Sequence, residues 1–400
     1  MFAHMNSLYT FYSWTDIVAV LLYLTVTLFL CKKLSRYKGP FLLLSVLHLA
    51  MTCFYYYNGT VNIDVSDCAM YYRVSYQYSG SWISILSIRE SVSFIWFLCL
   101  PLIHILKLNY LGCFISFSII GLLGWFLLFR VILDVLVSKK KSKWIYFVFL
   151  PQLHYWTCAI GKDSIIFFLI CLALFTWHFR KPMWTFFLSV LLIAPIRIHI
   201  SVGIMLAYVL SVFFSKRHYT WQKKTILGFV FLVGLFLSFK VALLVTSSFN
   251  LQELSEYVTR DDAKYSDTNA GVDLSGASWG VKVLSFLFRP LFFDARNYLM
   301  VEASVENVFW LLLCLTIALR LCNRQTRREA DWHYLGFAIL SILILSLGLS
   351  YGNSNLGIAV RQKTMIFPFL FYSLFLLQPL KLSQRYKTTN TPTSINPLLK

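Results

Sequence analysis

Four short cationic segments interrupt an otherwise apolar chain: Gly161-Lys162-Asp163, Arg197-Ile198-His199, Arg289-Pro290 and Arg361-Gln362-Lys363. Lysine and arginine near a membrane are normally concentrated in cytoplasmic loops, whereas the topology derived below places all four segments on the opposite face. Guanidinium and ammonium groups in such a position suit an anionic ligand, for example a lipid-linked phosphate or diphosphate. The sequence therefore predicts an anion-binding site that draws on five cations, Lys162, Arg197, Arg289, Arg361 and Lys363.

Acidic residues and a histidine lie close to these segments or in a long loop that the sequence predicts at 58–109. A reaction in which a hydroxyl group attacks needs a positioned carboxylate or imidazole to accept its proton. The candidates for this role are Asp64, Asp67, Asp163 and His199. For Asp163 a structural role is the alternative, because an acid in the first turn of a helix caps it and complements its dipole.

Aromatic residues are concentrated in the same first loop. Tyr71, Tyr72 and Trp82 follow a run of three tyrosines that begins at Tyr55. Aromatic faces pack against sugar rings while carboxylates accept from sugar hydroxyls, so one interpretation is a sugar-stacking surface. The other is an aromatic belt at the membrane interface.

The composition identifies the class of protein that must position these groups. Of 400 residues, 58% are hydrophobic and 13% are charged, which a soluble domain of this size could not keep in solution. Apolar runs long enough to cross a bilayer as helices recur from residue 15 to residue 380. We therefore predict an all-α fold, a polytopic transmembrane helical bundle.

Charge and cysteine content exclude several other classes. The net charge of +19 comes from basic residues in short loops, where they set membrane orientation, so nucleic acid is not an expected partner. The nine cysteines show no CxxC or Cys/His spacing, and neither a disulfide framework nor a metal site is expected.

The basic loops predict a topology. Placing six basic clusters in the cytoplasm gives strict alternation of eleven spans, with the N-terminus outside and the C-terminus inside. Segment 91–106 is read as a re-entrant or juxtamembrane helix; the alternative is that it crosses as a twelfth span. The expected spans are 16–31, 40–57, 110–137, 144–160, 163–179, 183–196, 199–215, 226–247, 304–322, 333–350 and 362–380.

This topology makes residues 1–380 one transmembrane domain, followed by a cytoplasmic tail at 381–400. Two long outer loops, 58–109 and 248–303, are its main features outside the membrane, and long loops in compact proteins are often functional. Within the second loop, residues 279–293 are expected to form a helix in the membrane interface.

Two positions are expected at helix ends. Pro195 divides a long apolar stretch, which forces Arg197 and His199 toward the outer boundary. A span at 362–380 makes Arg361 open the last helix, where a cation is unfavourable for the helix dipole unless an anion offsets it.

The arrangement of these segments resembles the Wzy-type O-antigen and capsule repeat-unit polymerases, and more loosely the polyprenyl-phosphate glycosyltransferases. The resemblance covers most of the chain as an arrangement, although each motif is short. It is carried by Asp64 to Tyr72, by Leu150-Pro151 through Trp156 to Gly161-Lys162-Asp163, by Pro195 to His199, by Phe288-Arg289-Pro290 before Glu306-Asn307, and by Asn353 to Arg361.

The resemblance implies a multi-pass protein of the bacterial inner membrane that polymerises undecaprenyl-pyrophosphate-linked repeat units at the periplasmic face. Its partners would be those lipid-linked glycans, the lipid bilayer and other assembly proteins, such as a flippase and a chain-length regulator. No cofactor is needed, because fixed cations can stabilise the leaving diphosphate. The alternatives are a transferase that uses a polyprenyl-monophosphate sugar and, among non-enzymes, a lipid-linked oligosaccharide flippase.

Overall fold

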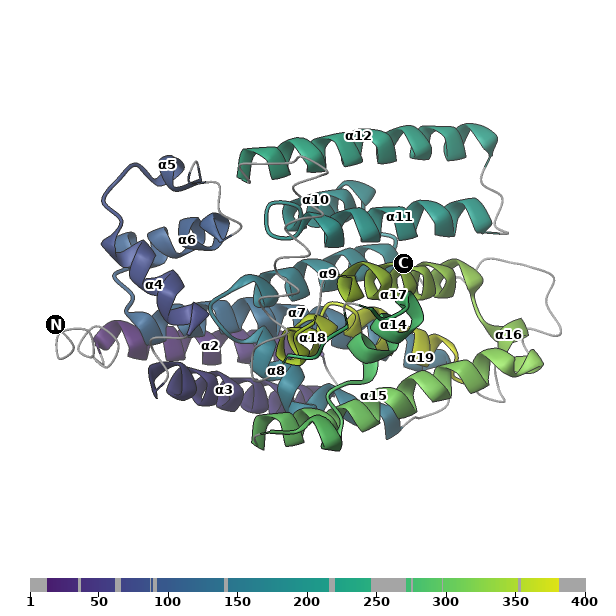
Figure 1. The fold of residues 1–400 in the computed structure, drawn as a ribbon, viewed down its shortest axis with the longest axis horizontal. Coiled ribbons are helices and arrows are strands. Elements are labelled where there is room, and N and C mark those ends of the chain that lie inside the picture. Colours follow the sequence, from purple (N-terminus) through teal and green to yellow (C-terminus); the bar gives the residue numbers. More distant parts are fainter. Residues whose placement is uncertain are drawn as a thin grey trace.

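The computed structural model is helical throughout the residues that it describes (Figure 1). Outside helices, two isolated bridges join Lys139 to Leu380 and Gly271 to Asn355. Asp64 lies outside the described residues, which are 13–34, 37–61, 66–86, 88, 92–139, 143–215, 220–245, 271–274, 276–296, 298–351 and 354–380.

Five of the described helices are long and apolar enough to cross a membrane, and a bent pair makes a sixth candidate. A helix of 19 residues, the shortest of them, is about 28 Å long, which matches the hydrocarbon core. The chain is thus a multi-pass helical membrane protein. The five are α2 (Trp14–Lys32), α3 (Lys38–Val61), α7 (Tyr110–Ser138), α15 (Tyr298–Cys322) and α17 (Trp332–Ser350).

The other elements are shorter, apart from α12. The apolar ones include α6 (Ser93–Leu100) with the π-helix η2 (Pro101–Ile105), α10 (Met183–Ile193), α11 (Ile198–Phe214), α12 (Trp221–Val245), α14 (Trp279–Phe288) and α19 (Phe367–Leu376). The remaining ones are α4 (Asp67–Gln77), α5 (Trp82–Leu86), η3 (Lys143–Phe149), α8 (Pro151–Thr157), α9 (Lys162–His178), η4 (Phe292–Asp294), α16 (Arg324–Glu329) and α18 (Leu356–Lys363).

These lengths change the expected count of spans. The sequence predicted eleven full crossings, but only five or six of the described helices are long and apolar enough to cross. Apolar composition alone does not show where a helix ends. For segment 91–106 the interpretation as a juxtamembrane or re-entrant helix agrees with the structure, because α6 and η2 together are too short to cross.

The predicted span 144–160 is wrong. In its place lie the 3-10 helix η3 and the seven-residue helix α8, and α8 meets α9 at an angle of 105°. Pro151 explains the first break, since proline cannot donate the backbone hydrogen bond that would continue a helix. It begins α8 after Leu150, whose backbone is extended.

The predicted span 362–380 is also wrong at its start. Asn355 caps α18 by accepting a hydrogen bond from the Ile358 amide, so this helix begins at Leu356. Arg361 therefore lies in the last turn of α18, where a cation is favourable for the helix dipole. The expectation that Arg361 opens a helix at an unfavourable position is wrong. A separate helix, α19, follows with Pro368 in its first turn.

Helix α7 forms much of the core. Gly121 and Gly124 let α8 and α9 approach it closely, because a β-carbon at Gly124 would lie 2.8 Å from the Phe167 ring. Trp125 is fully buried there and donates a hydrogen bond of 3.1 Å to Thr157 of α8. In Figure 1, α12 forms one edge of the molecule and α15 the opposite edge, with α9 and α17 between them.

Several basic loops meet at one end of the bundle. Lys139 at the end of α7 pairs with Leu380, and the Leu380 amide donates to Glu329 of α16 at 3.2 Å. Arg180, beyond the end of α9, donates to Tyr334 in the first turn of α17 at 3.1 Å. The grouping agrees with the expectation that these loops share one face.

Candidate functional site

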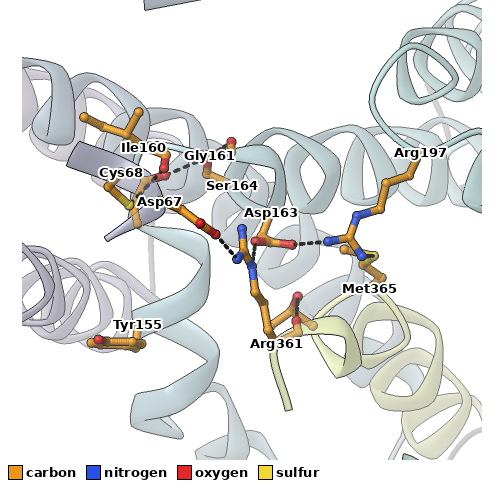
Figure 2. A network of polar contacts seen from close by, with 12 residues as sticks. Asp67, Cys68, Tyr155, Ile160, Gly161, Asp163, Ser164, Arg197, Arg361 and Met365 are labelled. Carbon is orange, nitrogen blue, oxygen red and sulfur yellow. Dashed lines mark hydrogen bonds and ion pairs between the residues drawn. The ribbon is translucent and has the colours of Figure 1, made fainter. Parts of the chain in front are cut away.

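Asp163 lies at the centre of a cluster of charged side chains (Figure 2). It occupies the first turn of α9, as expected, and its side chain is only 4% exposed. The guanidinium groups of Arg361 and Arg197 approach it from two sides: Arg361 Nε donates to Oδ2, and Arg197 Nη2 lies 3.6 Å from Oδ1. Residues from three distant parts of the sequence thus meet at the break between α8 and α9.

Asp67 completes this cluster from α4. Arg361 Nη1 donates to Asp67 Oδ2 at 3.0 Å, so one guanidinium bridges two carboxylates. The Asp67 side chain is 53% exposed, unlike that of Asp163. The neighbouring thiol of Cys68 donates to the carbonyl of Ile160 at 3.1 Å, which holds the start of α4 against the break.

The charges of the cluster do not cancel. Lys162 is half-buried beside Asp163 at the start of α9. Together Lys162, Arg197 and Arg361 carry three positive charges against the two negative charges of Asp67 and Asp163. The amino end of α9 adds the positive end of a helix dipole. The cluster therefore has a net charge of one positive unit from its side chains and could attract an anion.

Asp163 keeps one atom without a hydrogen-bond partner. Its Oδ1 is buried, and the 3.6 Å separation from Arg197 is too long for a hydrogen bond. Arg197 itself makes a long contact of 3.8 Å to the sulfur of Met365. A buried acceptor of this kind requires an explanation, and it could accept a proton from a bound hydroxyl group.

An aromatic wall lies beside the cluster. The Arg361 guanidinium lies 5.7 Å from the ring of Trp156 on α8, within cation–π range. Tyr155 stacks on Tyr55 with ring centroids 4.1 Å apart, and Trp156 meets both rings edge-on. Trp156 contacts the cluster and also lines an apolar cavity.

That cavity has a volume of about 230 Å³ and is mostly apolar. Its polar lining side chains are Gln152 and Glu302. The walls come from α3, α8, α15 and α18, through Met51, Phe54, Gln152, Tyr155, Trp156, Leu299, Met300, Glu302, Ala303, Leu356, Gly357 and Val360, together with Pro290.

Lys363 was predicted to bind an anion, but it is buried and donates hydrogen bonds to other groups of this chain. Its side chain donates to the carbonyl of Arg289 at 2.9 Å and to Asn307 Oδ1 at 2.5 Å. Asn307 in turn donates to the carbonyl of Pro290 at 2.7 Å. Lys363 thus ties α18 to α15 and to the segment that follows α14.

Arg289 does not join the cluster around Asp163 either. It makes a bidentate pair with Asp294, which also accepts from the Leu291 amide at 2.9 Å. Although burial opposes it, these hydrogen bonds lower the pKa of Asp294, and the hydrogen bond to Asp294 raises the pKa of Arg289. The pair borders a second cavity of about 310 Å³ with Arg296 and Asp273 on its lining.

Among the described contacts, the other predicted site residues make no hydrogen bond or ion pair with Asp163. His199 is in the first turn of α11 with an exposed side chain. Tyr71 and Tyr72 are each 3% exposed and packed in the core, so in this structure neither presents an open face to a sugar. Trp82 is half-buried on α5.

The role of Trp156 and the environment of Glu306 were not predicted from the sequence. Glu306 is buried on α15 and accepts a hydrogen bond of 2.9 Å from the backbone N–H of Gln152. A buried carboxylate and an indole inside apolar runs were the available signals, but sequence alone did not show that Glu306 contacts α8, the helix that carries Trp156. Among the described residues, no group of three or more His, Cys, Asp or Glu side chains could hold a metal ion.

No family model, curated protein or solved structure matches the chain. What the fold shows is a multi-pass helical membrane protein with a broken helix beside a charged cluster.

Proposed function

We propose that this protein polymerises undecaprenyl-pyrophosphate-linked oligosaccharide repeat units at the outer face of the bacterial inner membrane. The observation that carries the proposal is the meeting of Arg361, Arg197 and Lys162 around Asp163, next to an apolar cavity. A lipid-linked diphosphate has an anionic head and a long apolar tail. A site for it needs both features side by side, and this chain has them.

The proposed reaction is a glycosyl transfer. A hydroxyl oxygen on the acceptor repeat unit forms a bond to the anomeric carbon of the donor glycan. The bond between that carbon and the diphosphate oxygen breaks, and the diphosphate leaves with the electron pair. The acceptor hydroxyl proton passes to a carboxylate.

Arg361 and Arg197 would stabilise the leaving diphosphate. The hydrogen bonds of Arg361 to Asp163 and Asp67 use two of its five N–H donors, and charge-assisted bonds to phosphate are among the strongest that proteins make. Fixed cations at the place where negative charge develops lower the barrier without rearrangement. Lys162 adds a third positive charge beside them.

Asp163 is the best placed proton acceptor among the described acids. Its Oδ1 is buried without a hydrogen-bond partner, whereas Oδ2 is held by Arg361. A general base must lie within hydrogen-bond reach of the proton it removes. The salt bridge to Arg361 fixes the carboxylate so that Oδ1 has a defined direction.

A transferase that uses a polyprenyl-monophosphate sugar is the second candidate. The specific observation in its favour is Asp67, an exposed acid of the first long outer segment that is bound to Arg361. Such an enzyme would lengthen its product by single sugars. A polymerase would lengthen it by whole repeat units.

The test replaces Arg197 or Arg361 with alanine in a strain whose surface polysaccharide depends on this chain. We expect single repeat units to remain on the lipid while the ladder of longer products disappears. Arg328→Ala, in α16 at the basic end of the bundle, is the matched control and should leave the ladder unchanged. Full-length polymer from both variants, at normal protein levels, would refute the proposed role. A ladder with single-sugar steps would favour the second candidate.

A further inference from the structure

The apolar cavity lies between two helices at the edge of the bundle. Both α3 and α15 contribute to its walls, through Met51 and Phe54 on one side and Leu299, Met300 and Ala303 on the other. Only 28% of the most apolar stretch of each of these two helices is buried inside the protein, compared with 50% for α7 and α17. The outer faces of α3 and α15 are therefore largely free of protein contacts and available to lipid, next to a cavity that both helices line.

We propose that this cavity holds the first isoprene units of a polyprenyl diphosphate, which enters from the membrane between α3 and α15. This inference rests on the proposed function, because it assigns the tail of the lipid carrier to a place beside the charged cluster. The diphosphate head then lies at Arg361 and Arg197.

The lining suits a branched, irregular hydrocarbon chain. Two methionines line the cavity, Met51 from α3 and Met300 from α15, together with Leu299 and Val360. Methionine is flexible and polarisable, so it adapts to irregular apolar ligands. Glu302 on the same lining disfavours an anion inside the cavity, which places the head of the lipid outside it.

Two neighbouring regions could hold the head, and their charges decide between them. Met300 and Leu356 also border the second cavity, where Arg289 and Arg296 are balanced by Asp273 and Asp294. That region has no net charge. The cluster around Asp163 has an excess of one positive charge, and Trp156 connects it directly to the apolar cavity.

The size of the cavity limits what it can enclose. A volume of about 230 Å³ is below the range of roughly 300–1,000 Å³ that encloses a drug-sized ligand. It can accommodate the part of the chain nearest the diphosphate. The rest of the polyprenyl tail would remain in the bilayer beyond α3 and α15.

The experiment uses the full chain in nanodiscs with a geranylgeranyl diphosphate probe that carries a photoreactive diazirine on its first isoprene unit. Crosslinked peptides are mapped by mass spectrometry. We expect adducts on the α3 segment around Met51 and on the α15 segment around Met300. Unlabelled geranylgeranyl diphosphate should compete, whereas geranylgeraniol, inorganic pyrophosphate and phosphatidylglycerol should compete at least tenfold less well.

Two cavity-filling variants test the location. Ala303→Phe and Met51→Trp should each reduce crosslinking at least fivefold. Their controls are Val305→Phe on α15 and Val46→Trp on α3, at positions that are 43% and 57% exposed, and these should crosslink as the wild type does. Equal elution of all variants in size-exclusion chromatography verifies that they are folded.

The outcomes separate this inference from the proposed function. Unchanged crosslinking in both folded cavity variants, or equal competition by geranylgeraniol or phosphatidylglycerol, overturns the assignment of the cavity even if polymer is still made. Specific crosslinking that depends on the cavity supports the assignment even if Arg197→Ala and Arg361→Ala variants retain polymer, which would count against the proposed function alone.

Discussion

Lys363 and Asn307 are joined in the protein interior by a hydrogen bond of 2.5 Å between Nζ and Oδ1, although 56 positions separate them. The same ammonium group donates to the carbonyl of Arg289. These bonds hold α18 in place, and α18 carries Arg361. The position of the guanidinium at Asp163 thus depends on a lysine that does not belong to the charged cluster.

Replacing Lys363 with methionine should destabilise the protein. Methionine fills similar space but leaves Asn307 Oδ1 and the Arg289 carbonyl without their donor. A buried unsatisfied polar group costs about 1–3 kcal/mol, and we expect a loss within about that range in denaturant unfolding in detergent. Lys32→Met, at an exposed position on α2, is the control and should change stability little. Equal stability of both variants would show that the buried bonds contribute nothing.

The pair of Arg361 and Asp163 should show strong coupling in a double-mutant cycle. Arg361→Ala removes the main partner of a buried carboxylate, and breaking a buried ion pair typically costs about 3–5 kcal/mol. The double variant with Asp163→Ala should lose less than the sum of the two single losses, by about 1–3 kcal/mol. Unfolding curves of all four proteins measure this coupling. Additive losses would mean that the two side chains do not interact.

The pair of Arg289 and Asp294 predicts a dependence of stability on pH. The pKa of Asp294 is lowered in the folded protein from its ordinary value of 3.8, so folding favours the charged carboxylate. The contribution of the charged Asp294 to the free energy of unfolding is complete at neutral pH and is lost as the pH falls through the lowered pKa. The difference in melting temperature between wild type and Asp294→Asn should therefore be constant above about pH 5 and shrink in stronger acid. A difference that grows on acidification would contradict the pairing.

Close packing of α7 on α8 predicts a large effect at Gly121. A β-carbon there would overlap the backbone carbonyl oxygen of Thr157, and backbone cannot move aside as a flexible side chain can. Gly121→Ala should lower the melting temperature strongly or prevent folding. Gly336→Ala in α17 is the matched control, because nothing lies within 4 Å of its β-carbon position. Helix propensity there favours alanine by about 1 kcal/mol, so the control should be neutral or slightly more stable.

Properties that depend on local sequence were predictable. The long apolar helices, the break at Pro195 and the position of Asp163 in a first turn each follow from residues close in the chain, and the structure has all three. The ends of apolar segments were less predictable. The extended Leu150 before Pro151 divided a run that looked continuous by composition, and the cap at Asn355 began α18 before the predicted start at residue 362.

The partners of the charged groups could not be predicted from the sequence. Arg361 and Asp163 are 198 positions apart, and no local pattern indicates that α18 lies beside the start of α9. From the sequence, Arg289 and Lys363 were expected to belong to the same anion site as Arg361. In the structure Arg289 pairs with Asp294 and Lys363 is enclosed by protein partners, because tertiary packing decides which side chains share a cavity.

The 105° bend between α8 and α9 makes the number of residues in that turn as important as their identity. A single insertion or deletion between Thr157 and Lys162 would alter that bend, and so would move the amino end of α9, which carries Asp163, relative to Arg361 and Arg197. Homologues that share this architecture should tolerate many side-chain changes in the turn but few changes of its length.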